Sequence, residues 1–117
     1  MAETLSLRDR IKEYQNEILA GNLQPQRTSE ILLDISALLG NINDEITKRV
    51  MEYNSILLDL YTEEETANRA KIRADITPEY KAMRDAINTE KVAVELIRSL
   101  KYRLRTMDEE MRHGNVF

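Results

Sequence analysis

The chain of 117 residues contains no cysteine and no tryptophan, and it has only three glycines, two prolines and one histidine. Without cysteine, disulfides, thiolate nucleophiles and cysteine-ligated zinc sites are excluded. Three glycines cannot build a phosphate-binding loop, and the glycine-rich nucleotide-binding and nucleophile-elbow motifs are absent. A single histidine leaves almost no nucleophile–base pair available. We therefore expect a protein that is not an enzyme and that needs no cofactor.

Long apolar runs are also missing. No stretch approaches the roughly 18 apolar residues of a membrane span. Residues 1–9 lack the cationic and then apolar layout of a signal peptide. These features predict a protein that is not associated with a membrane and that resides in the cytoplasm.

What the chain does contain is typical of long helices. Charged residues make up 32% and hydrophobic residues 42% of the sequence, a composition found in coiled coils and helical bundles. The tripeptide Thr77-Pro78-Glu79 combines an N-cap, a first-turn proline and a first-turn acid. We therefore expect a helix over residues 78–112, ended by Gly114.

Two further helices are predicted before it. The residues Leu7, Ile11, Tyr14 and Ile18 recur at helical spacing and predict a helix over residues 6–20. Ser6 can cap this helix, and Gly21 ends it. A second, much longer apolar pattern predicts a helix over residues 28–73. Gly40 leaves two alternatives there: it ends one helix, or the helix continues because the apolar phase passes through without a slip.

The two long helices are matched in length and predict an antiparallel hairpin. The expected fold is one all-α domain over residues 1–117, a coiled-coil-like hairpin with a short N-terminal helix. A reversal at residues 74–77 would bring Leu57 to Val94, Tyr53 or Asn54 to Ile97, and Ile46 or Thr47 to Leu104. The seam is then expected to contain Ile46, Val50, Tyr53, Leu57, Leu60, Val94, Ile97, Leu100, Leu104 and Met107.

Two helices of this length cannot bury all of their apolar surface against each other. Each would extend about 50 Å at 1.5 Å per residue, and the short first helix covers only part of one of them. We therefore expect a homo-oligomeric bundle.

The best candidate for partner binding is a cationic stretch near the C-terminus. It consists of Arg98, Lys101, Tyr102, Arg103 and Arg105. Four cations without an intervening acid could contact successive phosphates of a nucleic acid, and the tyrosine could stack on a base. The alternative is a solvated face neutralised by acids of neighbouring helices, which the net charge of −4 favours.

A metal site is not expected. Glu110 and His113 form one Glu-x-x-His motif, whereas di-iron bundles need two such motifs and two further carboxylates on facing helices. The motif also lies in the last turn of the predicted helix.

Three segments of the chain together resemble a known family of small phage proteins. These segments are Leu57–Glu64, Pro78–Lys81 and Glu95–Leu104. Their sequences are LLDLYTEE, PEYK and ELIRSLKYRL. Over about residues 42–106 the pattern resembles the UvsY-type phage recombination mediators. This resemblance implies an oligomeric, all-helical protein that helps to load a recombinase onto single-stranded DNA. It also implies that the strand would contact Arg98, Lys101, Tyr102, Arg103 and Arg105.

These observations predict a non-catalytic, phage-type accessory protein for DNA recombination or replication. It would scaffold single-stranded DNA or a recombination or replication protein. Two alternatives stay open: a helical adaptor or inhibitor that binds a host protein, and a scaffold for virion assembly.

Overall fold

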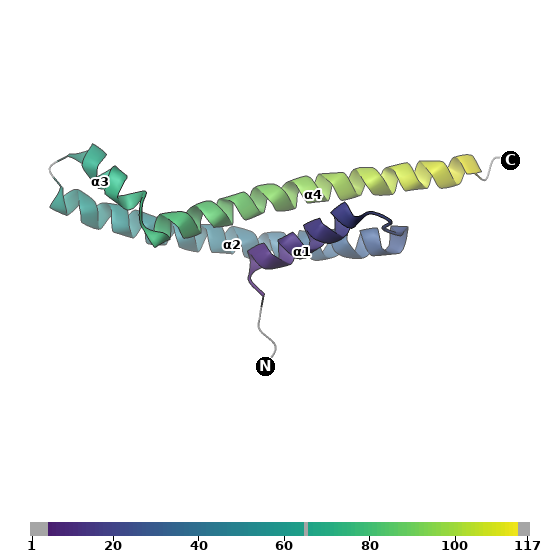
Figure 1. Ribbon diagram of the computed structural model, residues 1–117, viewed down its shortest axis with the longest axis horizontal. Helices are drawn as coiled ribbons and strands as arrows, with labels where there is room; N and C mark the ends of the chain where they lie inside the picture. The colour runs from purple at the N-terminus through teal and green to yellow at the C-terminus, as the bar shows by residue number, and fades with distance from the viewer. Residues whose placement is uncertain (1–4, 65, 115–117) are drawn as a thin grey trace.

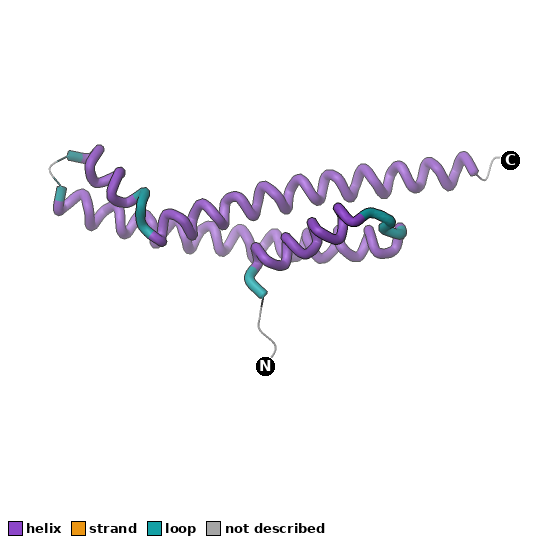
Figure 2. Tube along the Cα trace, viewed as in Figure 1, coloured by secondary structure: helices purple, strands orange, loops and turns teal. Residues whose placement is uncertain are grey.

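The computed structural model describes residues 5–64 and 66–114, which form four helices joined by short loops (Figures 1 and 2). The helices are α1 (Leu7–Ala20), α2 (Pro25–Glu63), α3 (Ala67–Ala74) and α4 (Pro78–Gly114). The predicted all-α class with a long hairpin is confirmed. Residues 1–4, 65 and 115–117 of the expected domain lie outside the described residues.

The starts of α1 and α4 are capped as predicted. The Ser6 hydroxyl accepts a hydrogen bond from the Asp9 amide at 3.1 Å. The Thr77 hydroxyl accepts from the Tyr80 amide at 3.3 Å and donates to the Ala74 carbonyl at 2.6 Å. These bonds satisfy amide and carbonyl groups that helix ends leave without partners.

The helix expected over residues 28–73 differs from the structure at its two ends, and of the two alternatives at Gly40 the continuous helix is the one observed. It begins at Pro25, because proline is well suited to a first helical position. It continues through Gly40, where the apolar face is unbroken. It ends at Glu63, and Thr66 then starts α3 by accepting a hydrogen bond from the Arg69 amide at 3.2 Å.

The chain therefore reverses earlier than predicted. Figure 1 shows α2 turning into α3 at one end of the molecule, with α3 and α4 then running back along α2. Residues 75–77 form only a bend between these two helices. The Tyr53 ring lies 5.6 Å from the Tyr80 ring, measured between centroids. The expected pairings of Tyr53 with Ile97, Leu57 with Val94 and Ile46 with Leu104 are wrong for this reason.

Two apolar clusters hold the helices together. The larger one joins three helices and contains Ile11, Ile31, Ile35, Leu38, Ile42, Ala93, Leu96 and Leu100. The smaller one lies at the reversal and contains Tyr53, Leu60, Ala70 and Ala74. Small residues on α4, including Ala86, Thr89 and Ala93, are buried facing α2. Ala86 and Thr89 were not expected in the seam, because alanine and threonine give a weak apolar signal.

The expected seam residues fall into three groups. Tyr53, Leu60 and Leu100 are buried. Ile46, Leu57 and Ile97 are half-buried against one cluster or the other. The remaining four are half-buried outside both clusters: Val50, Val94, Leu104 and Met107.

Polar contacts fasten α1 to α2. The Arg27 guanidinium donates two hydrogen bonds to the Glu17 carboxylate, at 2.7 and 2.8 Å. The Tyr14 hydroxyl donates to Asp34 at 2.6 Å, and this bond raises the pKa of the phenol. Such bidentate and charge-assisted bonds fix orientation as well as adding stability.

The molecule is long and thin, with principal dimensions of 75 × 36 × 22 Å. Its radius of gyration is 20.1 Å, against about 13 Å for a compact domain of this length. Within the described residues, no helix combines the length and apolarity that crossing a bilayer requires.

Candidate functional site

The structure places the predicted cationic residues on the C-terminal half of α4. We call residues 98–105 the cationic segment. Figure 1 shows that the end of α4 extends past the start of α2 and past α1. The segment thus leads from the packed three-helix region toward a free helix end. A partner can approach it from several sides.

One side of the cationic segment is open to solvent. Four residues are spaced by three, one and three positions along the helix, which places them on one helix face. They are Arg98, Lys101, Tyr102 and Arg105. All four are exposed, and the exposed fraction of Tyr102 is 71%. Leu100 lies on the opposite face and is fully buried. The buried face holds α4 in place, so the cations and the phenol point away from the core.

Most of these cations have no acidic partner. Arg98 forms an ion pair with Glu95, 3.0 Å between nitrogen and oxygen, with both side chains largely exposed. Over residues 5–64 and 66–114, Lys101, Arg103 and Arg105 form no ion pair. No acid occurs between Glu95 and Asp108. Neutralisation by neighbouring helices, the alternative reading of the sequence, is not observed for these three cations.

Arg103 lies on a different side and borders a groove. The groove has a volume of about 420 Å³ and runs between the end of α1 and α4. Its lining is Ile18, Ser99, Leu100, Tyr102, Arg103, Thr106, Met107 and Glu110. Tyr102 therefore borders both the cationic face and an apolar hollow. This arrangement suits a flat ring that stacks beside a cation.

The basic residues near the reversal are paired with acids, unlike most of those in the cationic segment. Arg73 forms ion pairs with Glu63 and Glu64, at 3.4 and 2.5 Å, and these raise its pKa. Lys71 pairs with Asp75 at 3.2 Å. This second basic group is partly neutralised, and it lies at the other end of the molecule from the cationic segment (Figure 1).

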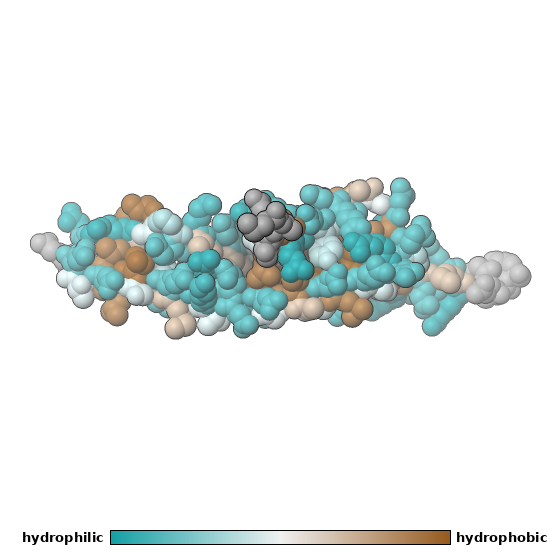
Figure 3. All heavy atoms as spheres, turned by 90° about the horizontal axis from the view of Figure 1, so that it is seen from below, coloured by the Kyte–Doolittle hydropathy of each residue, from teal (hydrophilic) through white to brown (hydrophobic). Residues whose placement is uncertain are grey.

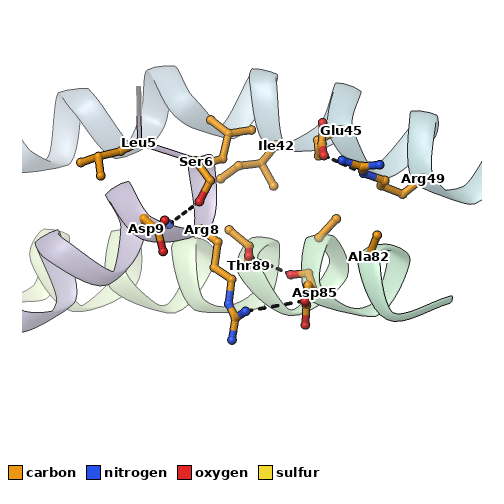
Figure 4. A pocket seen from close by; sticks show the side chains of 12 residues that line it. Leu5, Ser6, Arg8, Asp9, Ile42, Glu45, Arg49, Ala82, Asp85 and Thr89 are labelled. Carbon is orange, nitrogen blue, oxygen red and sulfur yellow. Dashed lines mark hydrogen bonds and ion pairs between the residues drawn. The ribbon is translucent and has the colours of Figure 1, made fainter. Parts of the chain in front are cut away.

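A larger cleft, with a volume of about 590 Å³, opens where α1 begins (Figure 4). Ile42, Ala82 and Ala86 form its apolar part. It exists because α1 covers only part of the groove between α2 and α4, and small alanines line the uncovered part. Sequence patterns did not predict it, since they do not show where a short helix begins against two long ones.

Four of the five charged side chains that line this cleft are already paired, and Asp9 is the exception. The Arg8 guanidinium lies 3.6 Å from the Asp85 carboxylate. The Arg49 guanidinium donates to Glu45 at 2.8 Å and to Glu52 at 3.0 Å, and these bonds raise its pKa. Among the described residues, no buried side-chain polar atom lacks a hydrogen-bond partner. The cleft therefore presents no buried unsatisfied group to a ligand, and its lining leaves only the exposed Asp9 carboxylate without an ion pair among the described residues.

The described part of the chain shows no group of three or more acidic, histidine or cysteine side chains placed to hold a metal ion. Glu110 and His113 are exposed on the last turns of α4.

Comparison of the chain with models of known protein families, with curated proteins and with solved structures found no match. Its function must therefore be inferred from its own residues.

Proposed function

We propose that this protein is a non-catalytic accessory protein of phage-type DNA recombination or replication, and that the cationic segment binds single-stranded DNA. The observation that carries the proposal is the exposed Tyr102 ring set among Arg98, Lys101 and Arg105 on one open helix face. The resemblance of residues 42–106 to the UvsY-type mediators supports recombinase loading as the setting. The site of action would be the host cytoplasm.

The chemistry of the segment suits a single strand better than a duplex. Lysine and arginine release counterions when they contact phosphates, which provides affinity without sequence preference. An exposed aromatic ring can stack on an unpaired base, and such stacking contributes about 1–3 kcal/mol per base. Lys101 and Arg105 are one turn apart, about 6 Å along the axis, on either side of the ring.

The net charge of −4 does not oppose this proposal. Several acids elsewhere are held by cations of their own helices, as Glu45 and Glu52 are by Arg49. The cationic segment has no acid of its own. Local charge within about one Debye length, ~10 Å at 0.1 M salt, governs the contact with a strand.

Fluorescence anisotropy with a labelled single strand at low salt tests the proposal. The triple variant Arg98→Ala/Lys101→Ala/Arg105→Ala should lose most of the binding. The matched control Arg10→Ala/Arg69→Ala/Arg84→Ala removes the same charge at exposed positions outside the segment, and it should bind nearly as the parent does. No binding by the parent, or equal loss in both variants, would contradict a dedicated site.

A second candidate function is a helical adaptor or inhibitor that binds a host protein. The groove beside Tyr102 favours it, because Ile18 and Met107 give it an adaptable apolar lining. A pull-down from host lysate treated with nuclease distinguishes the two. One dominant protein that resists nuclease and is lost on Met107→Glu would support the adaptor; capture that depends on nucleic acid would support the first proposal.

A further inference from the structure

One strip along the solvent side of α2 is poor in charge. We call the following exposed residues the outer face of α2: Leu33, Ser36, Ala37, Gly40, Asn43, Asp44, Thr47, Met51, Asn54, Ser55, Leu58, Tyr61 and Thr62. They follow at helical spacing on the side away from the buried Ile35 and Ile42. Asp44 is the only charged residue among them. An exposed helix face is normally rich in charge.

Large apolar side chains on this face are open to solvent. Leu33 is 71% exposed, Met51 is 66% exposed and Leu58 is 65% exposed. Half-buried Leu32, Leu39, Val50 and Leu57 extend the apolar surface along one edge. Figure 3 shows apolar residues reaching the surface at several places along the molecule, among hydrophilic ones. Apolar surface of this extent on a long helix marks an interaction site.

We propose that the outer face of α2 binds the same face of a second copy of this chain, with the two α2 helices antiparallel. A two-fold axis midway between Asp44 and Thr47 gives the contact. Leu33 then faces the partner's Leu58, and Met51 faces the partner's Gly40. Each large side chain meets either another large apolar side chain or a gap.

The fit of Met51 to Gly40 rests on the space above that glycine. Apart from Gly40, its two chain neighbours and the nearby backbone of α2 itself, no atom lies within 4 Å of the place where a Gly40 side chain would begin. A helix position without a side chain lets a partner's methionine come close to the backbone. Glycine is less favourable than alanine within a helix, and the close contact explains why the helix tolerates it.

The charges of the face also match under this symmetry. Asp44 faces the partner's Thr47 and lies beside the partner's Lys48. Within the described residues, neither Asp44 nor Lys48 forms an ion pair inside its own chain. The two-fold axis creates this contact twice. A parallel arrangement would instead place Asp44 against Asp44 and leave Gly40 against Gly40.

The available area agrees with a moderate dimer. From Leu33 to Leu58 the face is about 38 Å long. A strip covering about a third of the circumference offers roughly 500–600 Å² per copy, so a pair buries about 1,100 Å², just above the ~1,000 Å² expected of a specific interface. We expect a dissociation constant in the micromolar range.

Sedimentation equilibrium from about 1 to about 200 μM tests the association, and it requires no nucleic acid. The parent should change from monomer to dimer across this range. Leu33→Glu/Leu58→Glu should raise the dissociation constant about a hundredfold or more. The control Leu19→Glu/Met111→Glu changes two side chains of similar exposure, 77% and 62%, outside the face, and it should dimerise as the parent does. Circular dichroism confirms that both variants stay helical.

Cross-linking tests the orientation, and the lack of native cysteine makes it unambiguous. Mixed Gly40→Cys and Met51→Cys chains should form a disulfide-linked heterodimer under mild oxidation, in excess of either homodimer. A parent that stays monomeric throughout, a dimer that the glutamate pair does not weaken, or preferential linkage of Met51→Cys to itself would each overturn the proposal. Because these measurements omit DNA, they stand or fall separately from the proposed strand binding.

Discussion

The hydroxyl of Tyr53 on α2 donates a hydrogen bond to the carboxylate of Asp75, which follows α3. These two groups join the outgoing and returning parts of the hairpin near its reversal. Asp75 also accepts a hydrogen bond from Lys71 at 3.2 Å. The Tyr53 bond and the Lys71 charge lower the pKa of Asp75, whereas burial and then the Asp75 bond raise the pKa of Tyr53. This contact sets the register that the sequence did not predict.

Tyr53→Phe should lower the free energy of unfolding at neutral pH, because Asp75 loses a donor and the ring stays buried. The folded-state pKa of Asp75 is depressed, so its contribution exists above the unfolded value of about 3.9 and disappears as the pH falls through the folded value. The folded-state pKa of Tyr53 is raised, so its contribution is lost as the pH rises above about 10. Urea titrations should therefore show the largest difference between parent and variant from about pH 5 to 9. A difference that is constant from pH 2.5 to 7 would show that Asp75 is not the partner.

Leu100→Ala should destabilise the protein by about 2–5 kcal/mol, because the side chain is fully buried in the three-helix cluster. Tyr102→Ala, two residues away and 71% exposed, should change stability by less than about 0.5 kcal/mol. Urea denaturation followed by circular dichroism compares them. Equal effects would mean that α4 is rotated from the observed face.

Ala93→Leu should destabilise the protein by about 1–3 kcal/mol through overpacking, since Ala93 is fully buried in the three-helix cluster that α2 shares. Val94→Leu is the control, because Val94 is half-buried outside both clusters. It should be nearly neutral. The predicted pairing of Leu57 with Val94 placed Val94 at the contact with α2, so the opposite ranking of the two variants would support that predicted register.

Thr77→Ala should destabilise the protein by about 1 kcal/mol, because the α4 start loses its cap. Thr77→Ser keeps the hydroxyl and should recover most of the loss. Thermal unfolding of the two variants measures it. If serine is no better than alanine, the threonine methyl group matters and the cap does not.

Binding to single-stranded DNA, if it uses the cationic segment, should weaken steeply with salt. Each phosphate contact adds about −0.7 to the slope of log affinity against log salt. Removing Arg98, Lys101 and Arg105 together should reduce the magnitude of that slope by about 2. Anisotropy titrations from 50 to 300 mM salt measure both slopes. An unchanged slope with weaker binding would place the phosphate contacts elsewhere.

Local chemistry in the sequence determined that the chain is helical and where α1 and α4 begin. Ser6, Gly21 and Thr77 were recognisable because capping depends on residues within one turn. The unbroken apolar phase favoured a helix through Gly40. The composition of residues 98–105 also identified the candidate cations without any structure.

The tertiary structure alone decided where the chain reverses and which faces remain open. The chain reverses between the end of α2 and the start of α3. The sequence between these helices contains no glycine or proline, so no turn signal distinguished this reversal from the bend at residues 75–77. Periodicity shows which residues share a face but not which partner covers that face. Small residues such as Ala93 therefore became core, and Leu33 and Met51 stayed exposed, because helix packing depends on long-range contacts that no local window contains.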